Sequence, residues 1–439
     1  MSAGGGVRNL IARYRDTLGL FRRLRREHGP IVRYRLLDFE FCLLSDPELI
    51  EEVLYTKQQY FEKGFMYKRS LLLPRPTVIT GDGEDHKRRR RLIQPYFHRK
   101  MLSANASIMA RQVVAMTDTW RDGEIFDMDK TAHELGLSIS LEIFFGNALR
   151  VDAAMLQRVL RLCMIDIGLG LLPSRGLRRL ILFSFRRLQN AYQKMSREVL
   201  ARIEPARADA TPRYDLVSYL ARATDEDGAY AFSEEEVVDG VIEMLIASLT
   251  TTAATLTWAT YYLARNPAAR ETLEREVDET LNGRPPAFED CERLRYSGAV
   301  IAEALRLAPP AYYLGRRTTR DCTVGGWFMP AGSNVQLFYF LSQRDDRYFP
   351  QADMFRPERW LDPEAQPARP RCSYMPFGAG ARACAGEAFG RLNLTCALAG
   401  IAQRWRLDPV SEEFPSLNTL ASYAFRNGLP VKANARNPG

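Results

Sequence analysis

The chain has 439 residues, of which 46 % are hydrophobic and 26 % are charged, and its net charge is +8. We expect a soluble cytoplasmic protein, with no signal peptide, no transmembrane anchor and no stretch near the roughly 18 apolar residues needed to cross a bilayer. The cysteines are odd in number, scattered and without CxxC spacing, so neither a disulfide framework nor a zinc site is suggested; they are residues 42, 163, 291, 322, 372, 384 and 396.

The basic residues are densest at 87–91, where no aromatic residues are interleaved with them. RNA-binding segments usually show such interleaving, so we expect no nucleic-acid partner. An acidic protein partner fits the positive net charge better.

Short strands and one helix are expected in the first quarter of the chain. Residues 31–36 and 41–44 have strand-like composition, and Ser45-Asp46-Pro47 predicts a helix start with proline at an early position. Residues 87–306 are mostly helical in pattern, with breaks at 205–212 and 225–229. The last third returns to short strands, including 322–326 with a turn at 330–332, before a proline-rich irregular stretch at 349–376.

A cysteine in a glycine-rich loop follows this stretch. Residues 377–386 read FGAGARACAG, and an apolar helical segment comes next. The glycines allow the backbone to fold tightly around the sulfur, and the positive end of the helix points at the same atom. Cys384 is therefore predicted to be a stabilised thiolate, either a nucleophile or a metal ligand. The alternative is a half-buried structural cysteine near a helix start.

The loop matches the pattern Phe-x-x-Gly-x-Arg-x-Cys-x-Gly with Phe377, Gly380, Arg382, Cys384 and Gly386 at the required offsets. It resembles the haem-binding loop of the cytochrome P450 family. The resemblance implies that Cys384 is the axial ligand of the iron, and that Phe377, Arg382 and Gly386 help to bind the cofactor, haem b (iron protoporphyrin IX). A thiolate ligand is one of the ways in which proteins promote O–O cleavage.

The order of segments follows the family's arrangement over nearly the whole chain. It implies a mainly α fold with a minor β part, in a single domain that spans residues 1–439. That domain would comprise a small β-rich lobe (about 1–80), a helical body (81–310), and the strands, meander, ligand loop and last helix (311–439). Haem would lie between the long central helix that contains Thr251 and the loop that contains Cys384.

Glu303 and Arg306 are three residues apart on a predicted helix, so their side chains can form an ion pair. Exposed pairs with this spacing are common, and a solvated helix face is the alternative. About fifty residues later the chain reads FRPERW at 355–360. The resemblance implies that Arg359 joins Glu303 and Arg306 in a structural trio that braces the core behind the haem.

Haem propionates need cationic partners when they are buried. His86 and Arg90 are four residues apart and match the family's helix that presents these two side chains, while the basic residues beside them are expected to face solvent. Arg316, with Arg317 as the competing choice, and Arg382 complete the predicted propionate ligands. A surface salt bridge is the alternative role for any one of these arginines.

The apolar, threonine-rich segment 244–255 resembles the family's long central helix, whose pattern Ala/Gly-Gly-x-Asp/Glu-Thr aligns with residues 247–251. Ser248 replaces the glycine, Thr250 replaces the acid, and Thr251 keeps the alcohol; these three are the catalytic candidates. Thr250 has no proton that titrates near neutral pH, so proton delivery must use other groups, the substrate, or not occur at all.

Three interpretations follow from the missing acid. In the first, a normal monooxygenase uses waters and Glu243 as its proton path. In the second, a haem-thiolate enzyme gives an altered outcome, including peroxide-driven chemistry. In the third, the haem serves rearrangement, dehydration or ligand sensing. Thr252 and Thr255 are expected to bond back to helix carbonyls in any case.

The resemblance implies a monooxygenase of secondary metabolism that inserts one oxygen atom from O₂, by hydroxylation or epoxidation, into a terpenoid, fatty-acyl or polyketide compound. The pocket walls would come from residues 65–78, 246–247, 311–314 and 421–425. Residues 171–185 would cover the entrance or touch a membrane. We expect electrons from a separate ferredoxin or flavodoxin with its reductase, because no flavin or nicotinamide domain follows the Cys384 loop.

Overall fold

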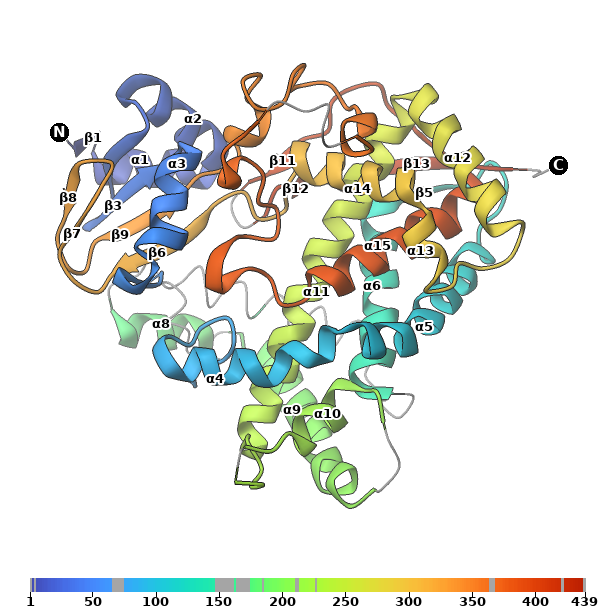
Figure 1. Ribbon diagram of the computed structural model, residues 1–439, viewed down its shortest axis with the longest axis horizontal. Coiled ribbons are helices and arrows are strands. Elements are labelled where there is room, and N and C mark those ends of the chain that lie inside the picture. The colour runs from blue at the N-terminus through green and yellow to red at the C-terminus, as the bar shows by residue number, and fades with distance from the viewer. Residues whose placement is uncertain are drawn as a thin grey trace. The chain divides into compact units, whose positions relative to one another are not determined.

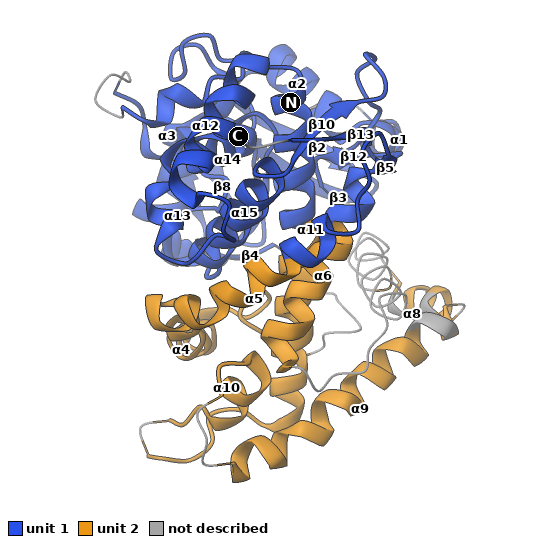
Figure 2. Cartoon of the chain, turned by 90° about the vertical axis from the view of Figure 1, so that its right-hand side faces the viewer, with its two compact units in different colours: residues 1–64, 113–132, 251–439 blue, residues 65–112, 133–250 orange. Residues whose placement is uncertain are grey.

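The computed structural model describes the chain except for residues 1, 4, 65–74, 147–161, 163–173, 184, 210–212, 226, 363–367, 420–421 and 437–439. The chain divides into two compact units: unit 1 is residues 1–64, 113–132 and 251–439, and unit 2 is residues 65–112 and 133–250 (Figure 2). Helices predominate and the sheets are small (Figure 1). This is the predicted mainly α class with a minor β part.

Unit 1 contains a six-stranded sheet in the order β1-β2-β3-β9-β6-β4. Its strands are β1 (Ser2–Ala3), β2 (Ile31–Leu36), β3 (Phe39–Leu44), β4 (Phe61–Lys63), β6 (Leu314–Thr318) and β9 (Asn334–Leu337). β3 pairs in parallel with β9, with Phe41 opposite Asn334, so strands from the two ends of the chain lie side by side. The predicted strand at 31–36 is confirmed, and the one predicted at 41–44 begins two residues earlier.

Among the described residues, unit 1 also contains three smaller sheets. They are formed by β10 (Trp405–Pro409), β13 (Pro430–Ala435) and β5 (Ile125–Asp127); by β7 (Cys322–Val324) and β8 (Trp327–Met329); and by β11 (Leu417–Asn418) and β12 (Ala424–Phe425). The strand predicted at 322–326 is too long. Gly325 and Gly326 have φ of 54° and 79° and form the turn into β8, a left-handed conformation that glycine adopts readily.

The helices of unit 1 are α1 (Gly6–Arg15), α2 (Thr17–His28), α3 (Pro47–Glu51), α12 (Pro267–Leu281), α13 (Asp290–Arg293), α14 (Arg295–Leu307) and α15 (Glu387–Ala402). α3 begins at Pro47, as predicted. Short turns are the π-helical η1 (Glu52–Thr56) and the 3₁₀ turns η2 (Gln58–Tyr60), η6 (Ser342–Arg344), η7 (Pro357–Trp360), η8 (Arg371–Ser373) and η9 (Gly380–Arg382). α14 packs against both η7 and α15.

Unit 2 is helical. It contains α4 (Gly83–Ile93), η4 (Gln94–Phe97), α8 (Arg175–Phe183), α9 (Arg186–Ala208) and α10 (Leu216–Arg222), and it shares α5 (Arg99–Thr117), α6 (Met128–Phe145) and α11 (Glu234–Ala264) with unit 1. The predicted break at 225–229 is confirmed as a tight loop, in which the Asp225 N–H donates to the Ala229 carbonyl at 2.9 Å.

The break predicted at 205–212 begins too early, because α9 continues through Pro205 to Ala208. Proline removes one backbone donor, but α10 packs along this turn and supports it. The Arg222 guanidinium donates to the Ala206 carbonyl at 2.5 Å, and the Asp209 N–H donates to the Pro205 carbonyl at 3.1 Å. Tertiary packing thus outweighs the local helix-breaking signal.

One buried cluster in unit 1 joins the six-stranded sheet to the segment before Cys384. Leu44, Leu337 and Val335 from the strands pack with Leu54 of η1 and with Met375, which precedes the cysteine loop. All five side chains are at most 3 % exposed. The sheet and η1 therefore form the support on which the loop is built.

α11 is the one described helix that is long and apolar enough, by length and composition, to cross a membrane. This differs from the expectation that no stretch would approach that limit. In the structure 61 % of its most apolar window is buried inside the protein. A buried core helix passes the same test, so this feature is weak evidence for a membrane span.

Candidate functional site

The Cys384 loop is a tight, hydrogen-bonded turn between η8 and α15. The Cys384 N–H donates to the Phe377 carbonyl at 2.8 Å, the Gly378 N–H to the Met375 carbonyl at 2.9 Å, and the Ala383 N–H to the Gly380 carbonyl at 3.0 Å. These bonds satisfy donors that would otherwise be unpaired in an irregular segment. The backbone around the sulfur is therefore held by the loop itself.

Two of the loop's glycines are required by their conformation. Gly378 and Gly380 have φ of 72° and 71°, a left-handed region in which a side chain is strained. A Cβ on Gly380 would also lie 2.3 Å from the Leu54 carbonyl oxygen of η1, which leaves no room for any other residue. Gly386 has an ordinary φ of −92° and serves as the N-cap residue of α15.

Cys384 differs from the other described cysteines in its exposure. Its residue is exposed, Cys291 is half-buried, and the remaining four are buried: Cys42, Cys322, Cys372 and Cys396. Burial raises the pKa of the Cys372 thiol to about 12, so that thiol stays protonated. Among the cysteines that the structure describes, Cys384 is therefore the most accessible as a ligand or nucleophile.

The first turn of α15 braces the loop on its other side. The Arg391 guanidinium donates to the Glu387 carboxylate at 2.9 Å and lies 4.9 Å from the centre of the Phe377 ring. This cation–π contact fixes the aromatic side chain of the motif against the helix that follows Cys384. The helix N-terminus supplies positive partial charge close to the sulfur.

Arg316 and Arg317 lie on opposite faces of β6, and their surroundings differ. Arg316 is 5 % exposed, and its guanidinium donates to the Gly315 carbonyl at 2.9 Å. Arg317 is half-buried and donates to the Gly332 carbonyl at 3.3 Å, in the turn at 330–332. The structure thus gives the two residues different environments, and Arg317 is engaged in bracing a turn. Arg382 lies at the end of η9 and is half-buried.

In unit 2, α4 carries His86 and Arg90. His86 is 6 % exposed and Arg90 is half-buried. The expectation that the neighbouring basic residues face solvent is wrong for Arg89, whereas Arg88 is half-buried. Arg89 is 5 % exposed, and its guanidinium pairs with the Asp85 carboxylate at 2.9 Å. Neighbouring residues on a helix point to different faces, so one can be buried while the next is exposed. A run of five basic residues does not show which of them lies on the buried face.

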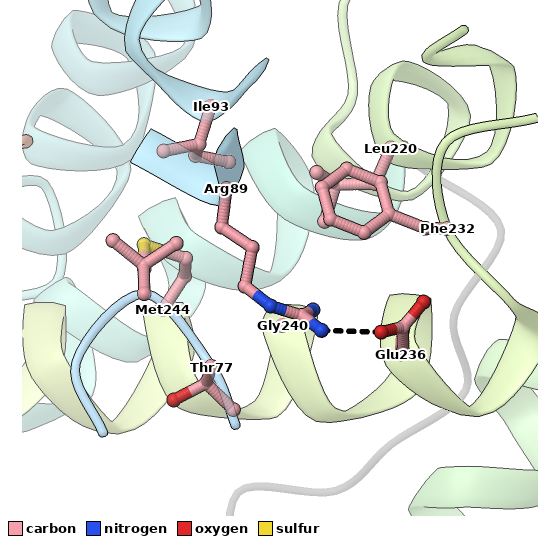
Figure 3. Close-up of a pocket in the computed structure, with 9 residues that line it drawn as sticks. Thr77, Arg89, Ile93, Leu220, Phe232, Glu236, Gly240 and Met244 are labelled. Carbon is pink, nitrogen blue, oxygen red and sulfur yellow. Dashed lines mark hydrogen bonds and ion pairs between the residues drawn. The ribbon is translucent and has the colours of Figure 1, made fainter. Parts of the chain in front are cut away.

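A second partner of Arg89 comes from α11, since its guanidinium also pairs with the Glu236 carboxylate. This ion pair lies in a pocket within unit 2 (Figure 3). The lining residues are Thr77, Val78, Arg89, Ile93, Leu220, Phe232, Glu236, Gly240 and Met244. None of the predicted haem-binding residues lines this pocket, which is distinct from the Cys384 loop.

The catalytic candidates on α11 have different environments. The Ser248 hydroxyl is 3.2 Å from the Ser140 hydroxyl of α6 and donates to the Leu245 carbonyl at 3.1 Å. Thr250 is half-buried, whereas Thr251 is exposed. Ser248, which stands in the place of the family's glycine, therefore joins α11 to α6. Ser140 was not predicted, and no local sequence signal marks it.

The Ser140–Ser248 contact is expected to stabilise unit 2. Replacing Ser140 with alanine should lower the free energy of unfolding by about 1 kcal/mol, the net value of one hydrogen bond. Ser248→Gly should cost about 2 kcal/mol, since it adds the helix penalty of glycine. Urea unfolding curves measure both changes. Equal values for Ser140→Ala and the wild type would show that this bond contributes nothing.

Glu243, the candidate for an alternative proton path, is 3 % exposed and has a structural task. Its carboxylate accepts hydrogen bonds from the Thr77 hydroxyl and from the Ile79 N–H, the latter at 3.0 Å. These bonds attach the turn at 77–81 to α11. Elsewhere on α11, the expected back-bonding is confirmed for Thr255, whose hydroxyl donates to the Thr251 carbonyl at 2.8 Å.

Glu303 is the centre of a buried ion cluster. Its carboxylate accepts from Arg306 at 2.8 Å and from Arg359 at 2.9 Å. The Trp360 indole and the Arg356 backbone N–H complete the cluster, each at 2.9 Å. The side chains of the three predicted members are at most 2 % exposed, so the alternative of a solvated helix face does not apply.

Further bonds anchor the cluster to the irregular stretch before Cys384. The Arg306 guanidinium donates to the carbonyls of Gln343 and Ala352 at 2.7 and 2.6 Å. Burial alone would raise the pKa of Glu303, but the hydrogen bonds and charges of Arg306 and Arg359 outweigh it, so that pKa lies below its ordinary value. Glu303 is therefore a carboxylate at neutral pH.

The predicted pocket walls are only partly described. Residues 65–74 and 421 lie outside the described residues. Ile246 and Ala247 are half-buried, Ala311 is exposed, and Leu314 is half-buried. Of the predicted covering segment 171–185, residues 171–173 and 184 are outside the description. The rest includes α8, on which three apolar side chains are exposed: Leu177, Leu180 and Phe183.

The chain's own residues fit a haem. An accessible thiol at a helix N-terminus is a suitable iron ligand, and Arg316 is a suitable cationic partner for a carboxylate. When bound, haem supplies the activation of O₂ that no amino-acid side chain provides. Nothing in the loop geometry opposes such a ligand set.

Comparison with known proteins agrees with this assignment. The family model for Cytochrome P450 matches residues 8–427. Cyclooctatin synthase of Streptomyces melanosporofaciens is 35 % identical over 87 % of this chain and 84 % of its own. Pentalenene oxygenase of Streptomyces avermitilis is 30 % identical over 94 % of this chain and 92 % of its own.

The fold is also shared with a solved structure, the retinoic acid-bound cyanobacterial CYP120A1. The TM-score is 0.85 at 20 % sequence identity, and the match covers 98 % of this chain and 96 % of that one. At this identity the match shows the fold alone, whereas the family model and the curated relatives show the family. The chain therefore belongs to the cytochrome P450 family and is a cytochrome P450 monooxygenase.

Proposed function

We propose that this enzyme inserts one oxygen atom from O₂ into a hydrophobic terpenoid, by hydroxylation or epoxidation, with Cys384 as the thiolate ligand of haem b. The exposure of Cys384, on a loop whose Gly378 and Gly380 have left-handed conformations, is the observation that carries the proposal. The substrate class is supported by the relatives, whose names are cyclooctatin synthase and pentalenene oxygenase. Fatty-acyl and polyketide compounds are the other candidates.

The remaining site residues divide by task. Arg316, Arg382, His86 and Arg90 seat the propionates, because guanidinium and imidazole groups donate hydrogen bonds to carboxylates. Phe377 and Gly386 shape the loop against α15. The buried cluster around Glu303 holds the meander that leads to the loop, so its part is structural.

Proton delivery is assigned to α11. The Thr251 hydroxyl, on an exposed position of the helix, holds a water that can donate a proton during O–O cleavage. Thr250 cannot donate a proton near neutral pH, and Ser248 is directed to Ser140. The Oε1 atom of Glu243 accepts the bonds from Thr77 and Ile79, which hold this carboxylate against the turn at 77–81.

The second candidate function follows from the same substitution at Thr250. Without an acid at this position, a haem-thiolate enzyme can use peroxide directly or perform a rearrangement or dehydration. These reactions need no proton relay fed by a separate electron donor. The monooxygenase is favoured because the relatives include an oxygenase by name.

We also propose that electrons come from a separate ferredoxin or flavodoxin with its reductase, that the enzyme acts in secondary metabolism, and that it works in the cytoplasm. The net charge of +8 supports an acidic donor protein.

The first test is the optical spectrum of the reduced protein with carbon monoxide, followed by a screen of cyclic terpenes, fatty acids and polyketides for spin-state shifts. A strongly red-shifted carbonyl Soret band supports the thiolate ligand, and hits among the terpenes support the substrate class. Substrate-dependent NAD(P)H consumption with a surrogate ferredoxin and reductase then separates the two functions. Product formed without NAD(P)H consumption would favour the second.

Placing a carboxylic acid at position 250 tests whether its absence limits proton delivery on α11. Thr250→Glu is expected to raise the product formed per NAD(P)H consumed and to reduce hydrogen peroxide leakage, because a carboxyl next to Thr251 can hand protons to its water. Product and peroxide are measured in the same turnover assay. Thr250→Gln, which has the same shape without the proton, is the control. Unchanged yield and leakage in Thr250→Glu would remove support for the missing-acid hypothesis.

A further inference from the structure

Two thiols are in contact between α13 and the second half of α15. The sulfurs of Cys291 on α13 and Cys396 on α15 are 3.4 Å apart, although the residues are separated by 105 positions in the chain. Cys396 is fully buried and Cys291 is half-buried. A disulfide requires the sulfurs to approach to about 2.05 Å, so a small closing movement suffices.

Contacts other than the sulfurs hold the two elements together. The Arg284 guanidinium donates to the Asp290 carboxylate at 2.6 Å, and the Ala287 N–H donates to the same carboxylate at 2.8 Å. The Gln403 amide, just after α15, donates to the Arg284 carbonyl at 3.1 Å. The segment 284–290, which leads into α13, is thus held against the end of α15 by hydrogen bonds. The two thiols are therefore in contact before any oxidation.

We propose that Cys291 and Cys396 form a reversible disulfide, a redox-sensitive site on the helix that follows the Cys384 loop. The oxidant is a peroxide. Cys291, the more accessible thiol, is oxidised to a sulfenic acid as one water is released. The Cys396 thiol then displaces the hydroxyl group from that sulfur, which forms the S–S bond and releases a second water. A dithiol reductant returns both thiols by exchange and becomes a disulfide itself.

The two cysteines have different parts in this sequence. The hydrogen bond that Cys396 shares with Cys291 and its burial both raise the pKa of the Cys396 thiol, so it stays protonated until its partner is oxidised. The Cys291 sulfur also lies 3.5 Å from the Ala287 carbonyl, which orients it along the α13–α15 contact. The first oxidation is therefore assigned to the residue at the edge of the surface.

The cross-link has a structural consequence. α15 begins three residues after Cys384, and α13 leads into α14, which carries Glu303 and Arg306. A bond between Cys291 and Cys396 would connect these elements and close a long loop, which restricts the unfolded chain. We expect the oxidised protein to unfold at a higher urea concentration than the reduced protein, with the haem spectrum unchanged.

The test uses the haem-loaded full chain, treated with a small excess of hydrogen peroxide and then blocked with N-ethylmaleimide. Non-reducing peptide mass spectrometry should find the peptides of Cys291 and Cys396 joined, with two hydrogens lost, and dithiothreitol should separate them. Cys291→Ser and Cys396→Ala should each abolish the joined species and the shift in unfolding midpoint. Cys322→Ser, at a buried cysteine of β7, is the matched control and should retain both.

Every other outcome overturns the proposal. These outcomes are oxidation of Cys291 to sulfinic acid without a joined peptide, a joined peptide that contains a different cysteine, and full recovery of unmodified thiols after peroxide. The carbonyl spectrum of each variant shows that it has folded, so a missing joined peptide is not the result of misfolding. The test does not depend on the substrate or on the reaction proposed above.

Discussion

Replacing Cys384 with alanine is expected to abolish the red-shifted Soret band of the reduced, carbon monoxide-bound protein and to reduce oxygenation to the level of free haem. The thiolate is the proposed iron ligand, and alanine has no group that can replace it. The loop should keep its shape, because its hydrogen bonds are made by the backbone of Phe377, Cys384 and their neighbours. The measurement is the carbonyl difference spectrum of the purified variant, together with its haem content.

Cys372→Ala is the matched control. This cysteine is also close to the loop, on η8, but it is fully buried and its thiol remains protonated. The control variant should keep the red-shifted band. A thiolate-type spectrum in Cys384→Ala would show that another residue binds the iron. A histidine-type spectrum in the wild type would overturn the ligand assignment and the roles built on it.

Glu303→Gln should be the most destabilising of the conservative substitutions considered. Glutamine keeps the shape of the side chain but removes its negative charge, which leaves the buried guanidinium groups of Arg306 and Arg359 without a counter-ion. Breaking a buried ion pair in this way typically costs about 3 to 5 kcal/mol. We expect a lower urea midpoint and loss of haem during purification, and no direct effect on the reacting atoms.

Glu84→Gln is the control for this variant. Glu84 also pairs with a cation three residues away, Lys87, but its side chain is 85 % exposed, and exposed pairs contribute little to stability. Its unfolding curve should overlay that of the wild type. If Glu303→Gln also overlays the wild type and retains haem, the buried cluster is not what supports the loop.

The lowered pKa of Glu303 predicts that the free energy of unfolding depends on pH. The pKa of Glu303 is lowered below its ordinary value of 4.5 in the folded state, so the folded protein binds fewer protons there than the unfolded chain. The stability that it contributes is complete above pH 4.5 and is lost as the pH falls through the lower, folded-state pKa. The difference in unfolding free energy between wild type and Glu303→Gln should therefore shrink as the pH is lowered below 4.5. A difference independent of pH in this range would contradict this account.

Local sequence predicted the elements whose signals are local. The strand at 31–36 and the helix start at Pro47 are in place, because strand composition and a capped proline act through neighbouring residues. The left-handed glycines of the Cys384 loop belong to the same class, since positive φ is a property of the residue itself. The helix break predicted at 205–212 was wrong in its start because distant packing decides there, with α9 continuing through Pro205.

For the site residues, too, the sequence predicted the local pairs and missed the partners from distant segments. The pairing of Glu303 with Arg306 follows from helical spacing, but nothing in the spacing places the Trp360 indole or the Arg356 N–H on the same carboxylate. Likewise, the basic run of α4 does not reveal that Arg89 is the buried member, because that depends on Glu236 about 150 positions later. Ser140 opposite Ser248 is a partner of the same kind.

By itself the sequence determined the family, the cysteine loop and its required glycines, because these depend on residue types at short, fixed offsets. Only the tertiary structure decided which thiol is accessible, that Glu243 is bound to Thr77, and that Cys291 contacts Cys396. Exposure and contact between distant residues arise when separate segments pack together. That packing depends on the sum of many weak interactions, which no single segment of the chain contains.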